Sequence, residues 1–132
     1  MADYSGAENY YNKNMKEFML FIKATGNPVG NLPQEKQEEH IQKVGGFIQD
    51  IVTQGKMKNA QPLIPNGVNL TNEDGRFTEQ AINEKEEMIV GFYHIQAENL
   101  IEAIKIAKSD PRFDDGKWRM EIREIMKIDG IN

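Results

Sequence analysis

The chain has 132 residues, of which 39% are hydrophobic and 28% are charged, and this length and composition fit one soluble domain. Its formal net charge is −5, which disfavours nucleic acid and anionic membranes as partners. It contains no cysteine, which excludes disulfides, thiolate nucleophiles and cysteine-ligated zinc or iron–sulfur sites. Its apolar runs are too short to span a bilayer and its N-terminus lacks the apolar core of a secretory signal, so we expect a cytoplasmic protein.

Residues 1–14 are polar and lack hydrophobic periodicity. We therefore predict a flexible N-terminal tail, followed by a single domain over residues 15–132. The tail holds three tyrosines, Tyr4, Tyr10 and Tyr11. An alternative is that these rings dock on a partner protein, which would make the chain an interaction module.

The first strong element is a predicted strand from Lys16 to Lys23. Its apolar residues alternate between two faces, with Phe18, Leu20 and Ile22 on one face and Met19 and Phe21 on the other. Helices can cover only one face of a small α+β sheet, so the second apolar face needs another layer. The most economical layer is a second subunit, and we predict a homodimer.

A helix is predicted from Pro33, a residue suited to the first helical position, to about Gln54, with Gly55 ending it. Its expected apolar stripe consists of Ile41, Val44, Ile48, Ile51 and Val52. Two glycines, Gly45 and Gly46, lie inside this helix, where each costs about 1 kcal/mol relative to alanine. We expect them to allow close packing against the sheet or the other helix.

The middle of the chain predicts a second strand and a hairpin. The second strand covers Lys56–Leu63 and is closed by Pro65-Asn66-Gly67. Short strands at Val68–Leu70 and Arg76–Thr78 flank Asp74-Gly75, which is a strong hairpin turn signal. Residues 79–87 are polar and charged, and we interpret them as a loop at one end of the sheet.

The second half repeats the strand–helix–strand order. A strand over Met88–Gln96 leads to Asn99, which caps a helix over Leu100–Lys108 with Glu102 placed for a capping box. The helix stops at Asp110-Pro111, and a strand follows over Trp118–Ile125. That strand alternates core residues with charged ones, Trp118, Met120 and Ile122 facing the core and Arg119, Glu121 and Arg123 facing away.

Two strand–helix–strand units predict a ferredoxin-like α+β sandwich. In this fold class, a βαβ–βαβ order with an inserted hairpin forms an antiparallel sheet with two helices on one face.

Several segments, taken in order and spacing, resemble the YciI-related (DGPF-type) domain family over about Lys16 to Lys127. They are MKEFMLFIK at 15–23, GKMKNAQPLIPNG at 55–67, Lys85-Glu86 followed by Gly91-Phe92-Tyr93, AKSDPRFDDGKW at 107–118, and Glu121-Ile122-Arg123. The resemblance implies a dimeric α/β barrel, in which two ferredoxin-like sheets face each other. The family's Asp-Gly-Pro-Phe would fall at residues 79–82, which do not match it, and Asp74-Gly75 is interpreted as a turn.

The same resemblance implies a His–Asp pair, which some members of the wider family are thought to use. Asp110 matches the aspartate through Ser109-Asp110-Pro111, whereas His40 lies one helical turn before the expected position near Val44. As a catalytic pair, His40 would be a general base whose pKa is lowered near a helix N-terminus, and Asp110 would be its partner. The alternatives are a histidine at the rim of the core or the dimer interface, and an aspartate that only ends the helix.

Six further residues are candidates for ligand binding: Lys85, Glu86, His94, Arg119, Glu121 and Arg123. Arginines of this set suit an anionic small molecule, because a guanidinium binds carboxylates through paired hydrogen bonds. The alternatives are a solvated charge run at 84–87, a histidine that is only hydrogen-bonded, and ion pairs across the strands.

Two isolated histidines do not indicate a metal site, and phosphate-binding or dinucleotide-binding motifs are absent, so no cofactor is expected. We expect a protein that binds a small polar or anionic molecule in a cleft. The alternative is a cofactor-free acid/base enzyme of the lyase or isomerase type.

Overall fold

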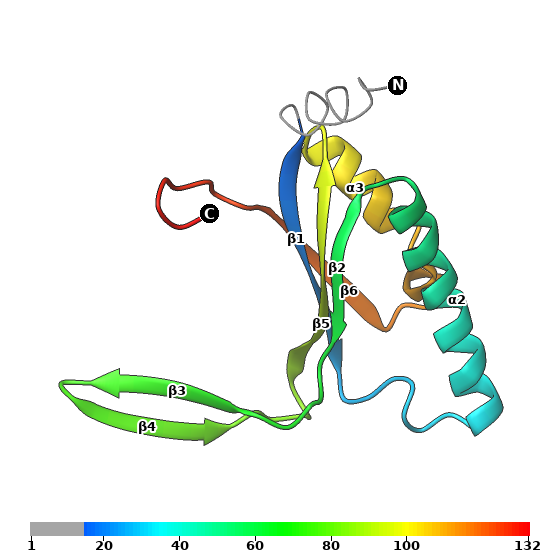
Figure 1. The fold of residues 1–132 in the computed structure, drawn as a ribbon. Helices are drawn as coiled ribbons and strands as arrows, with labels where there is room; N and C mark the ends of the chain where they lie inside the picture. Colours follow the sequence, from blue (N-terminus) through cyan, green and yellow to red (C-terminus); the bar gives the residue numbers. More distant parts are fainter. Residues whose placement is uncertain (1–14) are drawn as a thin grey trace.

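The computed structural model describes residues 15–132, so the predicted tail at 1–14 lies outside the described residues. Two helices cover one face of an antiparallel sheet, and a separate hairpin projects on the other side (Figure 1). In chain order the elements are β1 (Lys16–Thr25), α2 (Gln34–Thr53), β2 (Met57–Pro62), β3 (Val68–Glu73), β4 (Arg76–Ala81), β5 (Glu87–Ala97), α3 (Leu100–Lys108), the 3-10 helix η1 (Pro111–Asp114) and β6 (Trp118–Glu124).

The main sheet has four strands in the order β2-β5-β1-β6, and all neighbours are antiparallel. β1 lies in the centre, where Leu20 pairs with Tyr93 of β5 and with Ile122 of β6. The two strand–helix–strand units therefore interleave within one sheet. This arrangement confirms the predicted ferredoxin-like α+β fold.

The core lies between the sheet and the two helices. Alternation along β1 and β5 turns Phe18, Leu20 and Ile95 towards the helices, where each is 0% exposed. Asn99 caps α3 by accepting the backbone N–H of Glu102, as the sequence predicts. α3 then packs its small and branched face, Ala103, Ile106 and Ala107, into the same core.

Helix α2 differs from its predicted stripe. Phe47 is buried with Val44 and Ile51, whereas Ile41 and Val52 are 66% and 45% exposed. The buried face is centred on Val44, Phe47 and Ile51, and at about 3.6 residues per turn Ile41 and Val52 lie on one flank of it. The expectation of close packing at Gly45 and Gly46 is wrong, since an added methyl group at either would meet no atom within 4 Å. Within residues 15–132, no helix is both long and apolar enough to cross a membrane.

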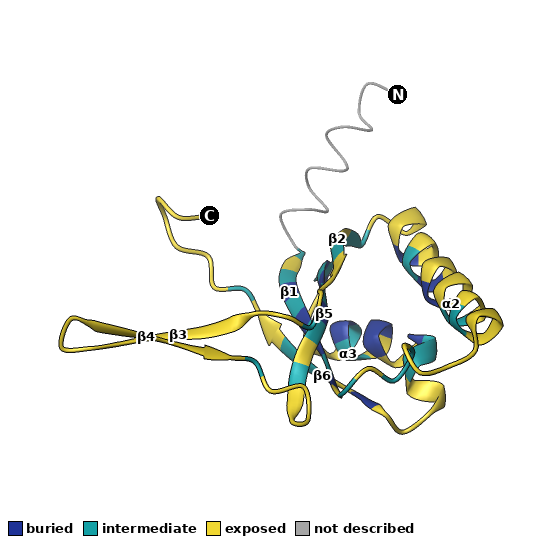
Figure 2. Cartoon of the chain, turned by 90° about the horizontal axis from the view of Figure 1, so that it is seen from below, coloured by how far each residue is buried: buried dark blue, intermediate teal, exposed yellow. Residues whose placement is uncertain are grey.

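The hairpin is longer than predicted. Asp74 and Gly75 take positive φ angles of 52° and 84°, the geometry of a tight two-residue hairpin turn. Pairing from this turn continues to Val68 opposite Ala81, so residues 79–81 belong to a strand and their prediction as a loop is wrong. All residues of β3 and β4 are exposed, and the hairpin points away from the helices (Figure 2). We call this hairpin the arm.

Candidate functional site

Two small cavities lie between α2, the helix-covered face of the sheet and η1. Their volumes are about 250 Å³ and about 240 Å³. Both are lined by His40, Ile41, Pro62 and Arg112, so they adjoin at these side chains. The larger one has mostly apolar walls, which include Ile22, Val44, Ile48 and Ala60. We call the two together the His40–Arg112 pocket.

The turn after α3 sets the polar end of this pocket. Asp110 and Pro111 end α3, as predicted, but they also begin η1, which the sequence did not predict. The Asp110 side chain caps η1, since its Oδ1 accepts the backbone N–H of Arg112 at 2.8 Å. Because of this short turn, the Arg112 guanidinium lies next to the carboxylate of Asp110, two residues earlier in the chain.

Asp110 is the centre of a buried network. Its side chain is fully buried. Its Oδ2 accepts the Tyr93 hydroxyl at 2.9 Å and Arg112 Nη1 at 3.2 Å. The same Nη1 also donates to the Tyr93 oxygen at 2.6 Å. Burial raises the pKa of Tyr93 well above its usual value. The phenol therefore stays protonated and donates a hydrogen bond to Asp110.

His40 lies beside this network without joining it. Its ring stacks on Trp118, with centroids 5.6 Å apart and an interplanar angle of 16°. The Arg112 guanidinium carbon is 5.3 Å from the centroid of the same Trp118 ring. Asp110 is hydrogen-bonded by Tyr93 and Arg112, and none of the described hydrogen bonds joins it to His40. The structure thus places His40 in the wall of the pocket and Asp110 next to it, bonded to the lining residues Tyr93 and Arg112, without a direct pair.

The pKa of His40 is lowered from its ordinary value. Burial is the main cause, and the positive charge of Arg112 adds to it, while the Asp110 carboxylate acts in the opposite direction. The lowered pKa was predicted, but from the helix N-terminus rather than from burial and Arg112. His40 is therefore neutral at pH 7, with a ring nitrogen available as an acceptor or base.

We expect an NMR titration to give His40 a pKa below about 6.5, its unperturbed value. Asp110→Asn should lower this pKa further, because the variant removes the negative charge that favours the imidazolium. His94, the only other histidine, is bonded to Glu17 and serves as the internal control. An unchanged His40 pKa in Asp110→Asn would contradict electrostatic coupling between the two residues.

The lowered pKa of His40 also determines whether the stability of the fold rises or falls with pH. A histidine with a lower pKa in the folded state binds fewer protons there than in the unfolded chain. Its contribution to stability is therefore complete above about pH 6.5 and is lost as the pH falls from there towards the folded-state pKa. Urea unfolding in this pH window should show a weaker pH dependence in His40→Gln than in the wild type.

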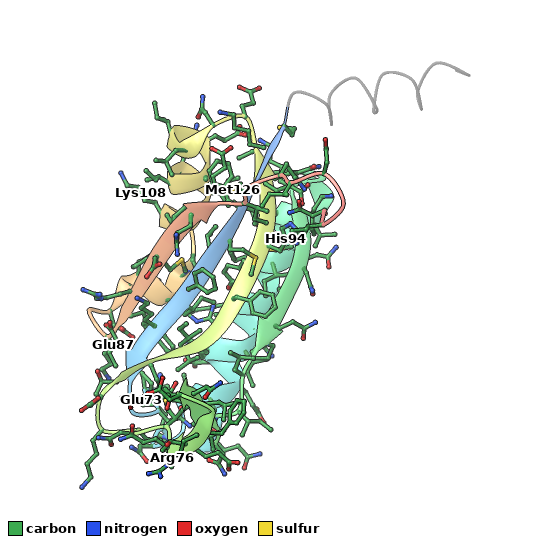
Figure 3. The ribbon with its side chains drawn as sticks, turned by 90° about the vertical axis from the view of Figure 1, so that its left-hand side faces the viewer. Glu73, Arg76, Glu87, His94, Lys108 and Met126 are labelled. Atoms are coloured by element: carbon green, nitrogen blue, oxygen red, sulfur yellow. The ribbon has the colours of Figure 1, made fainter. Side chains whose placement is uncertain are left out.

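The six residues predicted to bind a ligand line neither cavity of the pocket. Four lie on strands and form ion pairs or hydrogen bonds. Glu121 binds Lys23 at 2.7 Å, Arg119 binds Glu87 at 2.8 Å, Arg123 lies 3.9 Å from Glu121, and His94 binds Glu17 at 2.6 Å. His94 is on the face of the sheet that the helices leave open (Figure 3). Arg119, Glu121 and Arg123 are on the same face, because they pair with Lys23, Phe21 and Met19 of β1, and Met19 also pairs with His94. Lys85 and Glu86 lie in the turn before β5.

Sequence reasoning missed three residues of the pocket: Tyr93, Arg112 and Trp118. The alternation of β5 places Tyr93 on the core face, and a buried tyrosine hydroxyl usually has a hydrogen-bond partner. The need of the Tyr93 hydroxyl for a buried partner was the signal in the sequence that a polar side chain lies next to it in the core. Within the described part of the chain, His, Asp and Glu side chains do not gather in groups of three that would hold a metal ion.

The model of the YCII-related domain family matches residues 16–129. The matched range contains every strand and helix of the structure. No curated protein matches the chain. Because the match spans most of its length, the chain belongs to the YCII-related domain family.

Proposed function

We propose that this protein binds a small polar or anionic molecule in the His40–Arg112 pocket and works as a homodimer. One observation carries the choice of pocket. Arg112 lines both cavities, and its Nε–H is buried with no acceptor among the described residues. A buried donor without an acceptor costs about 1–3 kcal/mol, and an oxygen of a bound molecule would remove this cost.

The pocket also limits what the ligand can be. A volume of about 250 Å³ corresponds to the liquid volume of roughly eight waters at about 30 Å³ each. The walls suit a compact apolar body, whereas Arg112 and the neutral His40 supply the polar contacts at one end. The ligand class is therefore a small molecule with an apolar part and a carboxylate or carbonyl oxygen.

Binding can be followed without a label, because Trp118 is the only tryptophan of the chain and it lies against His40 and Arg112. We expect members of a panel of small aliphatic and aromatic carboxylates and ketones to change its fluorescence. Arg112→Lys keeps the positive charge but removes the Nε–H donor. It should weaken binding by about 10-fold or more, as expected for one hydrogen bond to a charged group.

The matched control is Arg123→Lys, which makes the same change on the open face of the sheet and should leave affinity unchanged. Equal affinity of the wild type and Arg112→Lys would contradict the role of Nε–H. A panel in which no member changes the fluorescence would contradict the ligand class.

The homodimer is supported by the face of the sheet without helices. Met19, Phe21 and Phe92 lie there, half-buried within one chain. Ion pairs such as Lys23–Glu121 surround them. A second sheet packed on this face would cover the three apolar side chains, as in the dimeric α/β-barrel arrangement.

A second candidate function is acid/base catalysis on the same ligand. The observation that favours it is the lowered pKa of His40, which leaves a neutral base at the wall of an apolar pocket near pH 7. Asp110 would act on His40 through its charge, because its oxygens are hydrogen-bonded to Tyr93 and Arg112. The His40 titration in Asp110→Asn also tests this candidate, since it measures that influence directly.

A further inference from the structure

Helix α2 forms one wall of the larger cavity of the His40–Arg112 pocket over about two turns. The residues that line the cavity from this helix are His40, Ile41, Val44, Gly45 and Ile48. From His40 to Ile48 the helix rises about 12 Å, at about 1.5 Å per residue. Gly45 is the one member of this set without a side chain, and it is exposed to solvent. The wall is therefore interrupted at Gly45.

The interruption lies between two apolar side chains. Gly45 follows Ile41 by four residues and precedes Ile48 by three, and residues at these spacings are neighbours on one face of a helix. A side chain at position 45 would therefore stand between those of Ile41 and Ile48. A Cβ atom added there would meet no side chain and no neighbouring strand within 4 Å. We call this empty space between Ile41 and Ile48 the notch.

Nothing within the chain requires glycine at position 45. Its φ angle is not among the positive ones, and no neighbour excludes a side chain. Glycine inside a helix is destabilising relative to alanine. Gly46 has the same disadvantage and is equally free of neighbours, but it lines neither cavity of the pocket. What distinguishes Gly45 from Gly46 is therefore its place in the wall of the pocket.

The notch lies towards the apolar end of the pocket. The polar groups, Arg112 and His40, lie together against Trp118. Gly45 is five residues beyond His40, or about 7.5 Å farther along the helix axis. A ligand oxygen that accepts the Arg112 Nε–H would thus leave the apolar part of the molecule to extend along α2 towards the notch.

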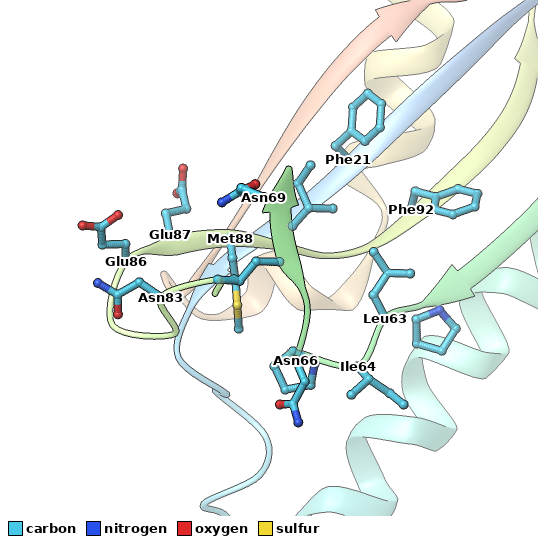
Figure 4. A pocket seen from close by; sticks show the side chains of 14 residues that line it. Phe21, Leu63, Ile64, Asn66, Asn69, Asn83, Glu86, Glu87, Met88 and Phe92 are labelled. Atoms are coloured by element: carbon cyan, nitrogen blue, oxygen red, sulfur yellow. The ribbon is translucent and has the colours of Figure 1, made fainter. Parts of the chain in front are cut away.

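A second hollow nearby suits an apolar group less well. It is a concavity of about 820 Å³ on the open face of the sheet, and Leu63 and Met88 line both it and the smaller cavity of the pocket. Its lining also includes two carboxylates and three amides (Figure 4), which are Glu86, Glu87, Asn66, Asn69 and Asn83. Of the described residues, no Asp or Glu lines the larger cavity of the pocket. The notch is therefore the better place for an apolar group.

We infer that Gly45 sets the size of the ligand, because the apolar part of a carboxylate bound at Arg112 occupies the notch and lies against the Gly45 backbone. The ligand class narrows to carboxylates with an apolar part long enough to reach the notch. This inference rests on the proposed function, since it takes the His40–Arg112 pocket as the ligand site. It adds a specificity-determining residue that makes no polar contact.

Alanine at positions 45 and 46 tests the empty space without any ligand. Gly45→Ala and Gly46→Ala should both raise the urea midpoint of unfolding, and by similar amounts, because alanine is the better helix former and neither methyl group meets a neighbour. A lower midpoint in Gly45→Ala alone would show that the chain itself fills the notch, and this result would overturn the inference.

Valine at the same two positions tests the ligand. The probes are straight-chain carboxylates from acetate to octanoate, and their binding is followed by Trp118 fluorescence. A helical valine strongly prefers one rotamer, so in Gly45→Val the side chain stays in the notch. Longer carboxylates should bind about 10-fold more weakly or worse, the effect of a methylene that no longer fits its pocket. The shortest carboxylate that the wild type binds should keep its affinity.

The matched control is Gly46→Val, which makes the same change on α2 outside the pocket and should leave every affinity unchanged. Equal weakening in Gly45→Val and Gly46→Val would assign the effect to the helix as a whole and would overturn the role of the notch.

The failure of this inference and the failure of the proposed function give different results. If Arg112→Lys weakens the binding of the carboxylates but Gly45→Val binds all of them like the wild type, the pocket stands and the notch is excluded. If no carboxylate changes the Trp118 fluorescence of the wild type, the inference falls, and the proposed ligand class falls with it when the ketones also fail.

Discussion

Replacing Asp110 by alanine is expected to lower the free energy of unfolding by about 3–5 kcal/mol, the range for breaking a buried ion pair from one side. The variant leaves the Arg112 charge beneath the protein surface, where its side chain is only 13% exposed, without its counter-charge. It also removes the acceptor of the buried Tyr93 hydroxyl and the cap of η1. Urea unfolding at pH 7 measures the loss.

Asp114→Ala is the matched control, because Asp114 lies in the same 3-10 helix but is exposed. It should change stability by less than about 0.5 kcal/mol, as surface substitutions usually do. A loss below about 1 kcal/mol in Asp110→Ala would mean that the network contributes no more than one ordinary hydrogen bond.

Trp118→Ala should cost a similar amount, about 3–5 kcal/mol, and it should also damage the pocket. Trp118 is 8% exposed and belongs to the core cluster. One side of the pocket depends on its ring, since His40 stacks on it and the Arg112 guanidinium lies over it. Without the indole, both side chains lose the surface that orients them. Thermal unfolding and ligand binding, followed by calorimetry, measure the two effects.

Trp118→Phe distinguishes the loss of a buried aromatic ring from the loss of the indole itself. A phenyl ring restores a stacking surface and most of the buried apolar area, so this variant should recover more than half of the stability lost in Trp118→Ala. An exposed aromatic nearby, Phe113, is 40% exposed, and Phe113→Ala should cost about 1 kcal/mol or less. If Trp118→Ala costs no more than Phe113→Ala, the role of the indole as a wall between core and pocket is wrong.

The sequence predicts the fold because its strong signals are local and periodic. Alternation in β1 and β6 and the Asn99 cap of α3 each follow from a few neighbouring residues. The apolar stripe of α2 was predicted less accurately, because the rotation of the helix about its axis is set by packing on the sheet, and that packing buries Phe47 and leaves Ile41 on the flank. The extent of the arm also escaped prediction, since strand pairing at residues 79–81 is decided by the turn rather than by apolar periodicity.

The site was predicted only in part, for a physical reason. His40 lines the pocket and Asp110 lies next to it, but the groups between them come from separate parts of the chain. Arg112 reaches back because of η1, a single turn that leaves no periodic trace in the sequence. Tyr93 meets Asp110 only when β5 and the end of α3 pack together. Contacts of this kind depend on tertiary structure, and a residue pattern does not contain them.

The strand order of the main sheet has a consequence for how the chain folds. The central strand β1 comes first in the chain, but both of its neighbours, β5 and β6, come from the second half. Pairs such as Lys16 with Ala97 and Phe18 with Glu124 must close long loops before they stabilise anything. During synthesis, β1 and α2 leave the ribosome before either neighbouring strand of β1, so the backbone groups along both edges of β1 stay unpaired and open to aggregation until β5 and β6 have emerged.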